Sequence, residues 1–310
     1  MNCNCQSPSV LWGSSVVAPF KDSAWYMFDD PIQGDQNNCS LIASLSSVAW
    51  VMESLRLSCT YLKTNADKSR NYNVSFWPGP VNVPVSDVFP LDTLYDQPYC
   101  NAHARDKLEI WPALYEKAYA AKFHNAGENP CPLPQFLNDI NSPNKWHSNP
   151  LKPLWNLTGC GNSQKQEAFF ISDSNSYDFF QEIKNRCNLG KTVYPMTAWV
   201  KPQNLLPNEV DGVIKPDHVY TVLGHKFVNN VEYLIIRDPT GVTVTNPPSP
   251  NCILSGNVTF NNNFRQNCSP ISRNYYNRSI TVPLGLGIFG LAGTKIEEYF
   301  QGFAWAGPGP

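Results

Sequence analysis

The clearest hydrophobic pattern in the chain begins after a polar, glycine-bearing stretch at residues 31–38. Apolar residues then recur every three or four positions, as in a helix that is buried along one side. These apolar positions are Leu41, Leu45, Val48 and Met52. The pattern predicts a helix over about residues 40–57, with Cys39 at or just inside its N-terminus.

The rest of the pattern mixes helices and strands. A second helix is predicted over residues 108–119, where Pro112 suits the first turn, and we expect it to pack against the helix at Cys39. The other predicted elements are a helix at 177–187 and strands at 72–76, 81–85 and 192–200. Apolar residues alternate over residues 288–303, and this segment is expected to complete the second half of the fold. Residues 124–165, rich in Pro, Asn, Gly and Ser, predict a break between two halves.

A hairpin in the second half brings a histidine and a carboxylate together. Two β-rich runs, residues 218–228 and 231–237, flank Asn229-Asn230. Folding the chain at this turn places Asp238 within a few residues of the position opposite His218. A carboxylate there can accept from one ring nitrogen and leave the other facing outward. We predict no such role for the remaining histidines, because His225 has no evident partner and the others lie in polar loops: His103, His124 and His147.

The position of Cys39 gives its thiol a chemical interpretation. At a helix N-terminus, unpaired N–H groups and the positive end of the helix dipole favour a thiolate. Gln33, six residues upstream, is placed to fold back and donate its amide N–H near the sulfur. Taken alone, the same pattern favours a small buried cysteine that starts a core helix, and only suggests a reactive thiol.

Composition narrows the class of protein. The 310 residues carry a net charge of −2, which gives no electrostatic case for nucleic-acid binding. The sequence has no apolar run long enough for a membrane span and no visible signal peptide. Its ten cysteines are scattered without metal-finger spacing, and with Cys39 free the other nine cannot all pair. A cytoplasmic location is therefore favoured, and secretion is left open.

Several motifs resemble those of the calpain family, which has a papain-like fold, in the family's order over residues 25–303. They are Gln33-Gly34 with Cys39 and its apolar helix, Glu109–Ala120, Leu157-Thr158-Gly159, His218–Gly224 and Arg237–Gly241. The segment Glu109–Ala120, which is similar to Glu-Phe-Trp-x-Ala-Leu-x-Glu-Lys-Ala-Tyr-Ala, is the most distinctive. Each motif is weak alone, and their common order makes the resemblance strong.

The resemblance implies an α+β, papain-like cysteine peptidase. A helical lobe (residues 1–160) is expected to carry the nucleophile and an antiparallel β lobe (161–310) the histidine and aspartate, with the active-site cleft between them. By this resemblance Cys39 is the nucleophile, His218 the base, Asp238 the orienting carboxylate and Gln33 the oxyanion donor. The expected partners are protein or peptide substrates, and the chain is expected to act as a monomer.

Departures from the family pattern bear on calcium and on the site. Asp238 stands where the family has Asn, Thr240 where it has a shielding Trp, and Ser40 where it has the Trp after the nucleophile. The family's acidic loop corresponds to residues 242–250, which contain no carboxylate. Calcium sites need several anionic oxygens. We therefore expect calcium independence, no cofactor and no metal site.

Three functions remain open on the sequence. The favoured one is a calpain-like cysteine endopeptidase. The second is another acyl transferase on the same residues, of the transglutaminase or deamidase type. The third is a catalytically inactive binding module, suggested by the polar replacements around Cys39 and by a glycosylation sequon at Asn38.

Overall fold

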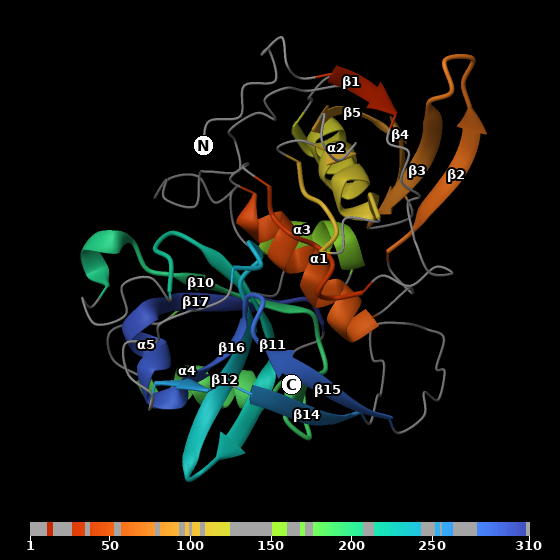
Figure 1. The fold of residues 1–310 in the computed structure, drawn as a ribbon. Coiled ribbons are helices and arrows are strands. Elements are labelled where there is room, and N and C mark those ends of the chain that lie inside the picture. Colours follow the sequence, from red (N-terminus) through yellow and green to blue (C-terminus); the bar gives the residue numbers. More distant parts are fainter. Residues whose placement is uncertain are drawn as a thin grey trace.

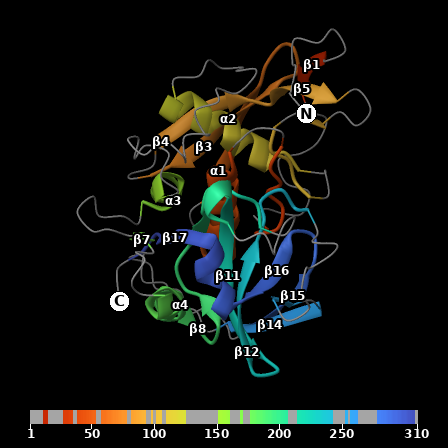
Figure 2. The same cartoon turned by 90° about the vertical axis from the view of Figure 1, so that its left-hand side faces the viewer.

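The computed structural model describes residues 11–14, 27–34, 38–52, 57–77, 81–92, 97–98, 101–105, 109–124, 151–159, 168–170, 176–206, 214–242, 252–254, 256–262 and 278–307. The described elements of residues 11–159 gather in the upper part of Figure 1, and those of residues 168–307 in the lower part. The view in Figure 2 shows the same separation. The division at residue 160 and a cleft between two lobes stay predictions.

Five α-helices lie in the described part of the chain. They are α1 (Cys39–Met52), α2 (Trp111–His124), α3 (Leu151–Thr158), α4 (Ser176–Lys184) and α5 (Ile296–Tyr299). Short 3₁₀ turns cover Gln203–Leu205 and Gly293–Lys295. Helix α2 has Pro112 in its first turn, where a missing N–H costs no helical bond. Helix α3 was not predicted. It ends at Gly159, whose φ of 61° is the left-handed conformation common after a helix.

The upper part contains two small antiparallel sheets. One joins β1 (Leu11–Ser14), β5 (Val88–Asp92) and β6 (Gln97–Pro98). The other joins β2 (Cys59–Thr64), β3 (Arg70–Phe76) and β4 (Val81–Ser86). The predicted strands at 72–76 and 81–85 are thus confirmed as β3 and β4, while β1, β2, β5 and β6 were not predicted. The first half is therefore not purely helical.

The lower part is built on a nine-stranded antiparallel sheet. Its strands follow the order β13-β16-β12-β11-β10-β17-β7; in addition β9 pairs with β11, and β8 pairs with β9. Their bounds are β7 (Ala168–Phe170), β8 (Cys187–Asn188), β9 (Lys191–Thr192), β10 (Met196–Val200), β11 (Val219–Val228), β12 (Val231–Arg237), β13 (Ile253–Leu254), β16 (Ile288–Ala292) and β17 (Phe300–Trp305). A separate ribbon joins β14 (Gly256–Asn262) and β15 (Arg278–Leu284).

The large sheet is buried on both faces. On β12, Tyr233 and Ile235 pack into the core that contains α1, α2 and α3, and Leu234 and Ile236 pack into the core that contains α4 and α5. A strand covered on both faces reads as a continuous apolar run rather than an alternating one. This explains the unbroken Leu234-Ile235-Ile236 sequence.

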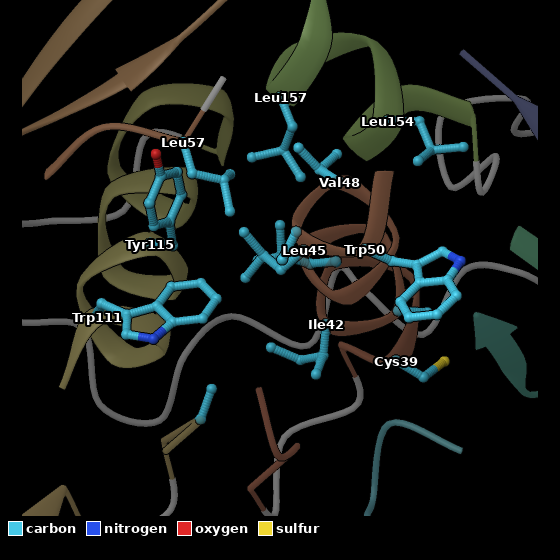
Figure 3. Packing of buried hydrophobic residues seen from close by; sticks show 14 of the residues in the cluster. Cys39, Ile42, Leu45, Val48, Trp50, Leu57, Trp111, Tyr115, Leu154 and Leu157 are labelled. Atoms are coloured by element: carbon cyan, nitrogen blue, oxygen red, sulfur yellow. The ribbon is translucent and has the colours of Figure 1, made fainter. Parts of the chain in front are cut away.

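Helix α1 lies between the two parts and differs from its prediction. It packs against α3 on one side and against β10 and β11 on the other, and residues 39–51 are all buried (Figure 3). The prediction of one buried side is therefore wrong. The serines on the other side are buried too, because their hydroxyls find partners: Ser44 donates to Ser40 O (2.7 Å) and Ser47 to Met196 O (3.0 Å).

Candidate active site

Cys39 is the first residue of α1, as the sequence predicts. The helix begins on the carbonyl of Asn38, which accepts hydrogen bonds from Leu41 N (2.9 Å) and Ile42 N (3.1 Å). The thiol therefore sits where the positive end of the helix dipole is strongest. Figure 3 shows its sulfur at this end of the helix. The Cys39 residue is 6% exposed.

A buried carboxylate on α2 fixes the residue before the nucleophile. Asn38 Nδ2 donates to Glu116 Oε1, and Glu116 Oε2 accepts from Asn101 Nδ2 (2.8 Å) and Ala102 N (2.9 Å). Burial raises the pKa of Glu116 to about 7, and the three hydrogen bonds only partly oppose it. Asn38 is fully buried in this network, so a folded chain does not offer its sequon to a glycan.

Sequence reasoning missed Glu116. It interpreted the helix at 108–119 only as a packing element. In the structure Glu116 reaches toward α1, while the neighbouring Lys117 Nζ donates to the carbonyls of Ser86 and Val88, both at 2.9 Å. The signal that could have located these contacts is the Glu-Lys pair of the most distinctive motif, because two adjacent charges on a buried helix need partners in opposite directions.

The hairpin of β11 and β12 places the histidine and the aspartate. Its turn residues Asn229 and Asn230 both have positive φ, 48° and 64°, as the tightest hairpin turns require. Thr221 pairs with Arg237, so His218 just before β11 and Asp238 just after β12 lie at the same end of the sheet. His218 Nε2 is 3.0 Å from Asp238 Oδ1.

The Cys39 side chain lies close enough to His218 to act on the pKa of the imidazole through hydrogen bonding and charge. Because Nε2 faces Asp238, the ring nitrogen left for the sulfur is Nδ1. Burial on its own lowers the pKa of His218, but the hydrogen bonds to Asp238 and Cys39 and their charges outweigh it and raise the pKa to about 9. The structure thus brings Cys39, His218 and Asp238 into one connected group, with His218 8% exposed.

Asp238 has more partners than the sequence indicates. Its Oδ1 also accepts from Thr240 N and Thr240 Oγ1, both at 2.8 Å, and its Oδ2 lies 2.8 Å from Lys215 Nζ. Burial raises the pKa of this carboxyl, but the imidazole of His218 and the ammonium of Lys215 outweigh burial and hold the pKa well below its usual range. Sequence reasoning missed Lys215, although it stands three residues before His218.

The segment of Gln33 is held against the residues that follow Asp238. Gln33 N donates to Pro239 O (2.8 Å). Gly241, at φ 67°, lies so close to Ile32 that a Cβ on it would come within 2.5 Å of Ile32 Cδ1. The backbone of Gln33 is therefore fixed beside the histidine side of the site. The role of its side-chain amide as an oxyanion donor stays a prediction.

Arg237 joins the nucleophile helix to this segment. Its fully buried guanidinium donates to Ser46 Oγ (2.5 Å), Asp29 O (2.9 Å) and Pro31 O (2.6 Å). Burial, with nearby Arg105, lowers its pKa to about 10, so it stays charged at neutral pH. Sequence analysis noted Arg237 only as part of a motif. In the structure it connects α1, β12 and the chain ahead of Gln33.

The other histidines differ partly from their predictions. The prediction that His225 lacks a carboxylate partner is wrong, because its Nδ1 is 3.2 Å from Glu232 Oε1 across the hairpin. His103 pairs through its backbone with Ile32. His124 ends α2, and His147 lies outside the described residues.

Within the described ranges no group of three or more His, Cys, Asp and Glu side chains is placed to hold a metal ion. Calcium independence remains a prediction. Among the helices described, none combines the length and the apolar character needed to span a bilayer.

A helix-end thiol beside an imidazole that is held by a carboxylate is an arrangement suited to nucleophilic catalysis by cysteine. Comparison with known proteins agrees: residues 23–129 match the family model of the calpain family cysteine proteases. The chain is also similar to a thiol protease of Porphyromonas gingivalis (strain ATCC BAA-308 / W83), with 28% identity over 231 residues, 72% of this chain and 46% of that protein.

These matches confirm the predicted resemblance to calpain-like cysteine proteases and support cysteine peptidase chemistry. The segment matched by the family model contains Cys39 and Glu116, whereas His218 and Asp238 lie beyond it. The chain spans about half the length of the curated relative that it matches.

Proposed function

We propose that this protein is a cysteine endopeptidase in which Cys39, His218 and Asp238 form the catalytic triad and Gln33 donates to the oxyanion. The observation that carries the proposal is the His218 ring placed between the Asp238 carboxylate, 3.0 Å from Nε2, and the Cys39 side chain, which acts on the pKa of the ring. The match of residues 23–129 to calpain family cysteine proteases and the similarity to a bacterial thiol protease support it.

The proposed reaction is acyl transfer through a thioester. His218 takes the Cys39 proton, and the thiolate attacks the carbonyl carbon of the substrate peptide bond, forming the S–C bond. The developing oxyanion accepts hydrogen bonds from the Gln33 amide and the Cys39 backbone N–H. The imidazolium then gives its proton to the leaving nitrogen as the C–N bond breaks.

Water completes the cycle. His218 removes a proton from a water molecule, whose oxygen attacks the thioester carbon, and the S–C bond breaks to release the acid product and restore the thiol. Asp238 keeps the ring oriented through both proton transfers. In this proposal no step requires calcium.

The test is mass spectrometry of a peptide library digested by the wild-type chain and by Cys39→Ala. Cleavage at internal peptide bonds by the wild type, absent from Cys39→Ala, is the expected result. Repeating the digestion with added primary amines separates the candidate functions. Amine-linked products without hydrolysis would identify an acyl transferase, and no Cys39-dependent product of either kind would leave a binding module.

A further inference from the structure

We infer that Lys215 is a positioning residue of this site: its ammonium neutralises the buried Asp238 carboxylate and, with the Thr240 hydroxyl, keeps Oδ1 of that carboxylate turned toward His218. The inference deepens the proposed function and rests on it. It concerns a residue that belongs to none of the motifs of the sequence.

The two oxygens of the Asp238 carboxylate contact different partners. Oδ1 faces His218 Nε2 at 3.0 Å, while Oδ2 faces Lys215 Nζ at 2.8 Å. Lys215 Nζ also donates to Thr240 Oγ1 (2.6 Å), and that hydroxyl donates to Asp238 Oδ1 (2.8 Å). Lysine, threonine and aspartate therefore close a small ring of polar contacts that leaves the carboxylate little freedom to rotate.

Lys215 is anchored from the backbone as well. Its N–H donates to the hydroxyl of the buried Tyr220 (2.9 Å), and the preceding Ile214 packs into the core beneath the large sheet. A surface lysine in an ion pair usually contributes little, because both side chains are mobile and solvated. Here the carboxylate side chain is only 5% exposed and the backbone of the lysine is held, although the lysine side chain itself remains 39% exposed.

Charge balance explains why a cation is needed at this position. In the reactive state the site holds a thiolate on Cys39 and an imidazolium on His218, which cancel. A buried carboxylate at 238 adds a third, uncompensated charge, and an unpaired buried charge is costly. Lys215 restores neutrality. The family resemblance places a neutral Asn at this position, where no such cation is required.

Other charged and titratable groups surround the carboxylate, and none replaces Lys215. The guanidinium of Arg237 is committed to Ser46, Asp29 and Pro31. The groups whose charges act on Asp238 or on the neighbouring Arg237 and Tyr220 are His218, Cys39, Lys215, Arg105, Asp29 and Asp30. Among these groups, Lys215 supplies the ammonium that contacts the Asp238 carboxylate directly.

The test follows the alkylation rate of Cys39 by iodoacetamide as a function of pH, in the 310-residue chain. In a thiolate–imidazolium pair the upper inflection of this rate reports loss of the imidazolium proton. Lys215→Met removes a cation from beside the carboxylate, so the imidazolium is stabilised more strongly. We expect the upper inflection to move about half to one pH unit higher. Lys215→Arg keeps the positive charge, so its upper inflection should stay near that of the wild type.

A second lysine on β11 supplies the control. Lys226 donates to Thr259 O (2.9 Å) away from the site, so Lys226→Met changes the net charge equally without touching Asp238. Wild-type inflections in Lys215→Met, or an equal shift in Lys226→Met, would overturn the inference. If Lys215→Met does not fold, Thr240→Val loosens the same ring of contacts without removing the cation, so the carboxylate holds the His218 ring less firmly and the upper inflection should fall. An upper inflection that does not change in Thr240→Val counts against the inference.

Alkylation titrates the pair of Cys39 and His218 whether or not peptides are hydrolysed. A chain that shows the shift and cleaves no peptide would contradict the proposed function and leave the role of Lys215 at Asp238 intact. If the wild-type chain cleaves peptides but Lys215→Met leaves the inflections of the alkylation rate unchanged, the proposed function stands and the inference about Lys215 is contradicted.

Discussion

Two buried carboxylates flank the candidate site, and their environments are opposite. Glu116 stands behind the nucleophile, where it meets only neutral amide donors, and its pKa is raised to about 7. Asp238 stands behind His218, where it meets an imidazole and an ammonium, and its pKa is held well below the usual range. Both are almost completely removed from solvent.

The difference shows that the charge of the partners decides what a buried carboxylate does. Amide donors satisfy the oxygen lone pairs of Glu116 but supply no compensating charge, so burial dominates its pKa. Cations compensate Asp238, so it stays ionised and can hold an imidazolium. On this account Glu116 is a structural anchor for Asn38 and the start of α1, and Asp238 is the acceptor that orients His218 during the reaction.

The largest expected effect comes from removing the Asp238 side chain. Asp238→Ala leaves His218 unoriented and Lys215 without its partner, so kcat/KM for peptide cleavage should fall on the order of 10³-fold or more. Asp238→Asn is the matched variant. An imidazolium carries both N–H groups and needs only an acceptor oxygen, so the amide should retain activity within about tenfold. Equal losses in the two variants would show that the charge itself is indispensable.

Gln33→Ala tests the next largest effect. Loss of one oxyanion donor typically lowers kcat about 10²–10³-fold with little change in KM. Gln203→Ala, at an exposed glutamine in the 3₁₀ turn, is the control and should behave as the wild type. An unchanged kcat in Gln33→Ala would remove this residue from the mechanism.

The Glu116 side of the comparison is tested through the pH dependence of stability. A folded pKa of about 7 lies above the ordinary value of 4.5, so the folded chain binds a proton that the unfolded chain releases. Its stabilising contribution is complete below about pH 4.5 and is lost as pH rises to about 7, which lowers the free energy of unfolding by about 3 kcal/mol at most.

Urea unfolding across this range measures the effect, with Cys39→Ala as the background to prevent self-cleavage. Glu116→Gln should abolish the fall in the free energy of unfolding between about pH 4.5 and 7. The control Glu297→Gln, at a half-buried position on α5, should keep that fall. The His218 contribution falls in a higher window, which begins at about pH 6.5, because Asp238 still raises the folded pKa of this histidine in the Cys39→Ala background. If the free energy of unfolding of Glu116→Gln still falls over this range, the pH dependence does not come from Glu116.

The smallest expected effect is that of metal removal. The charges that balance Asp238 are side chains of the protein, so a calcium chelator should leave kcat/KM unchanged. Activity measured with excess chelator and with added calcium checks this. A rise of tenfold or more on adding calcium would show that an ion completes the site.

The sequence predicted the parts of this account that depend on local patterns. The helix start at Cys39, the turn at Asn229-Asn230 and the approach of Asp238 to His218 all follow from hydrophobic period and turn chemistry. The resemblance of the motifs to calpain-like proteases was recognised in the same way and is supported by the comparisons.

What the sequence did not predict depends on contacts between distant segments. Glu116 and Asn38 are 78 residues apart, and nothing in either segment points to the other. The sequence predicts that α1 is buried along one side, yet Ser47, whose hydroxyl donates to a carbonyl 149 residues away, is buried as well. No pattern in the sequence pointed to Lys215, because its anchor, Tyr220, is defined only by the folded sheet.

The central claim, that Cys39 and His218 form a reactive pair, is tested most directly by alkylation of Cys39 at pH 6. An isolated thiol is almost fully protonated there, so rapid modification requires the paired imidazole. The account predicts fast labelling in the wild type and in His225→Ala, whose ring faces Glu232 instead, and slow labelling in His218→Ala. Equal labelling rates in His218→Ala and the wild type would contradict it.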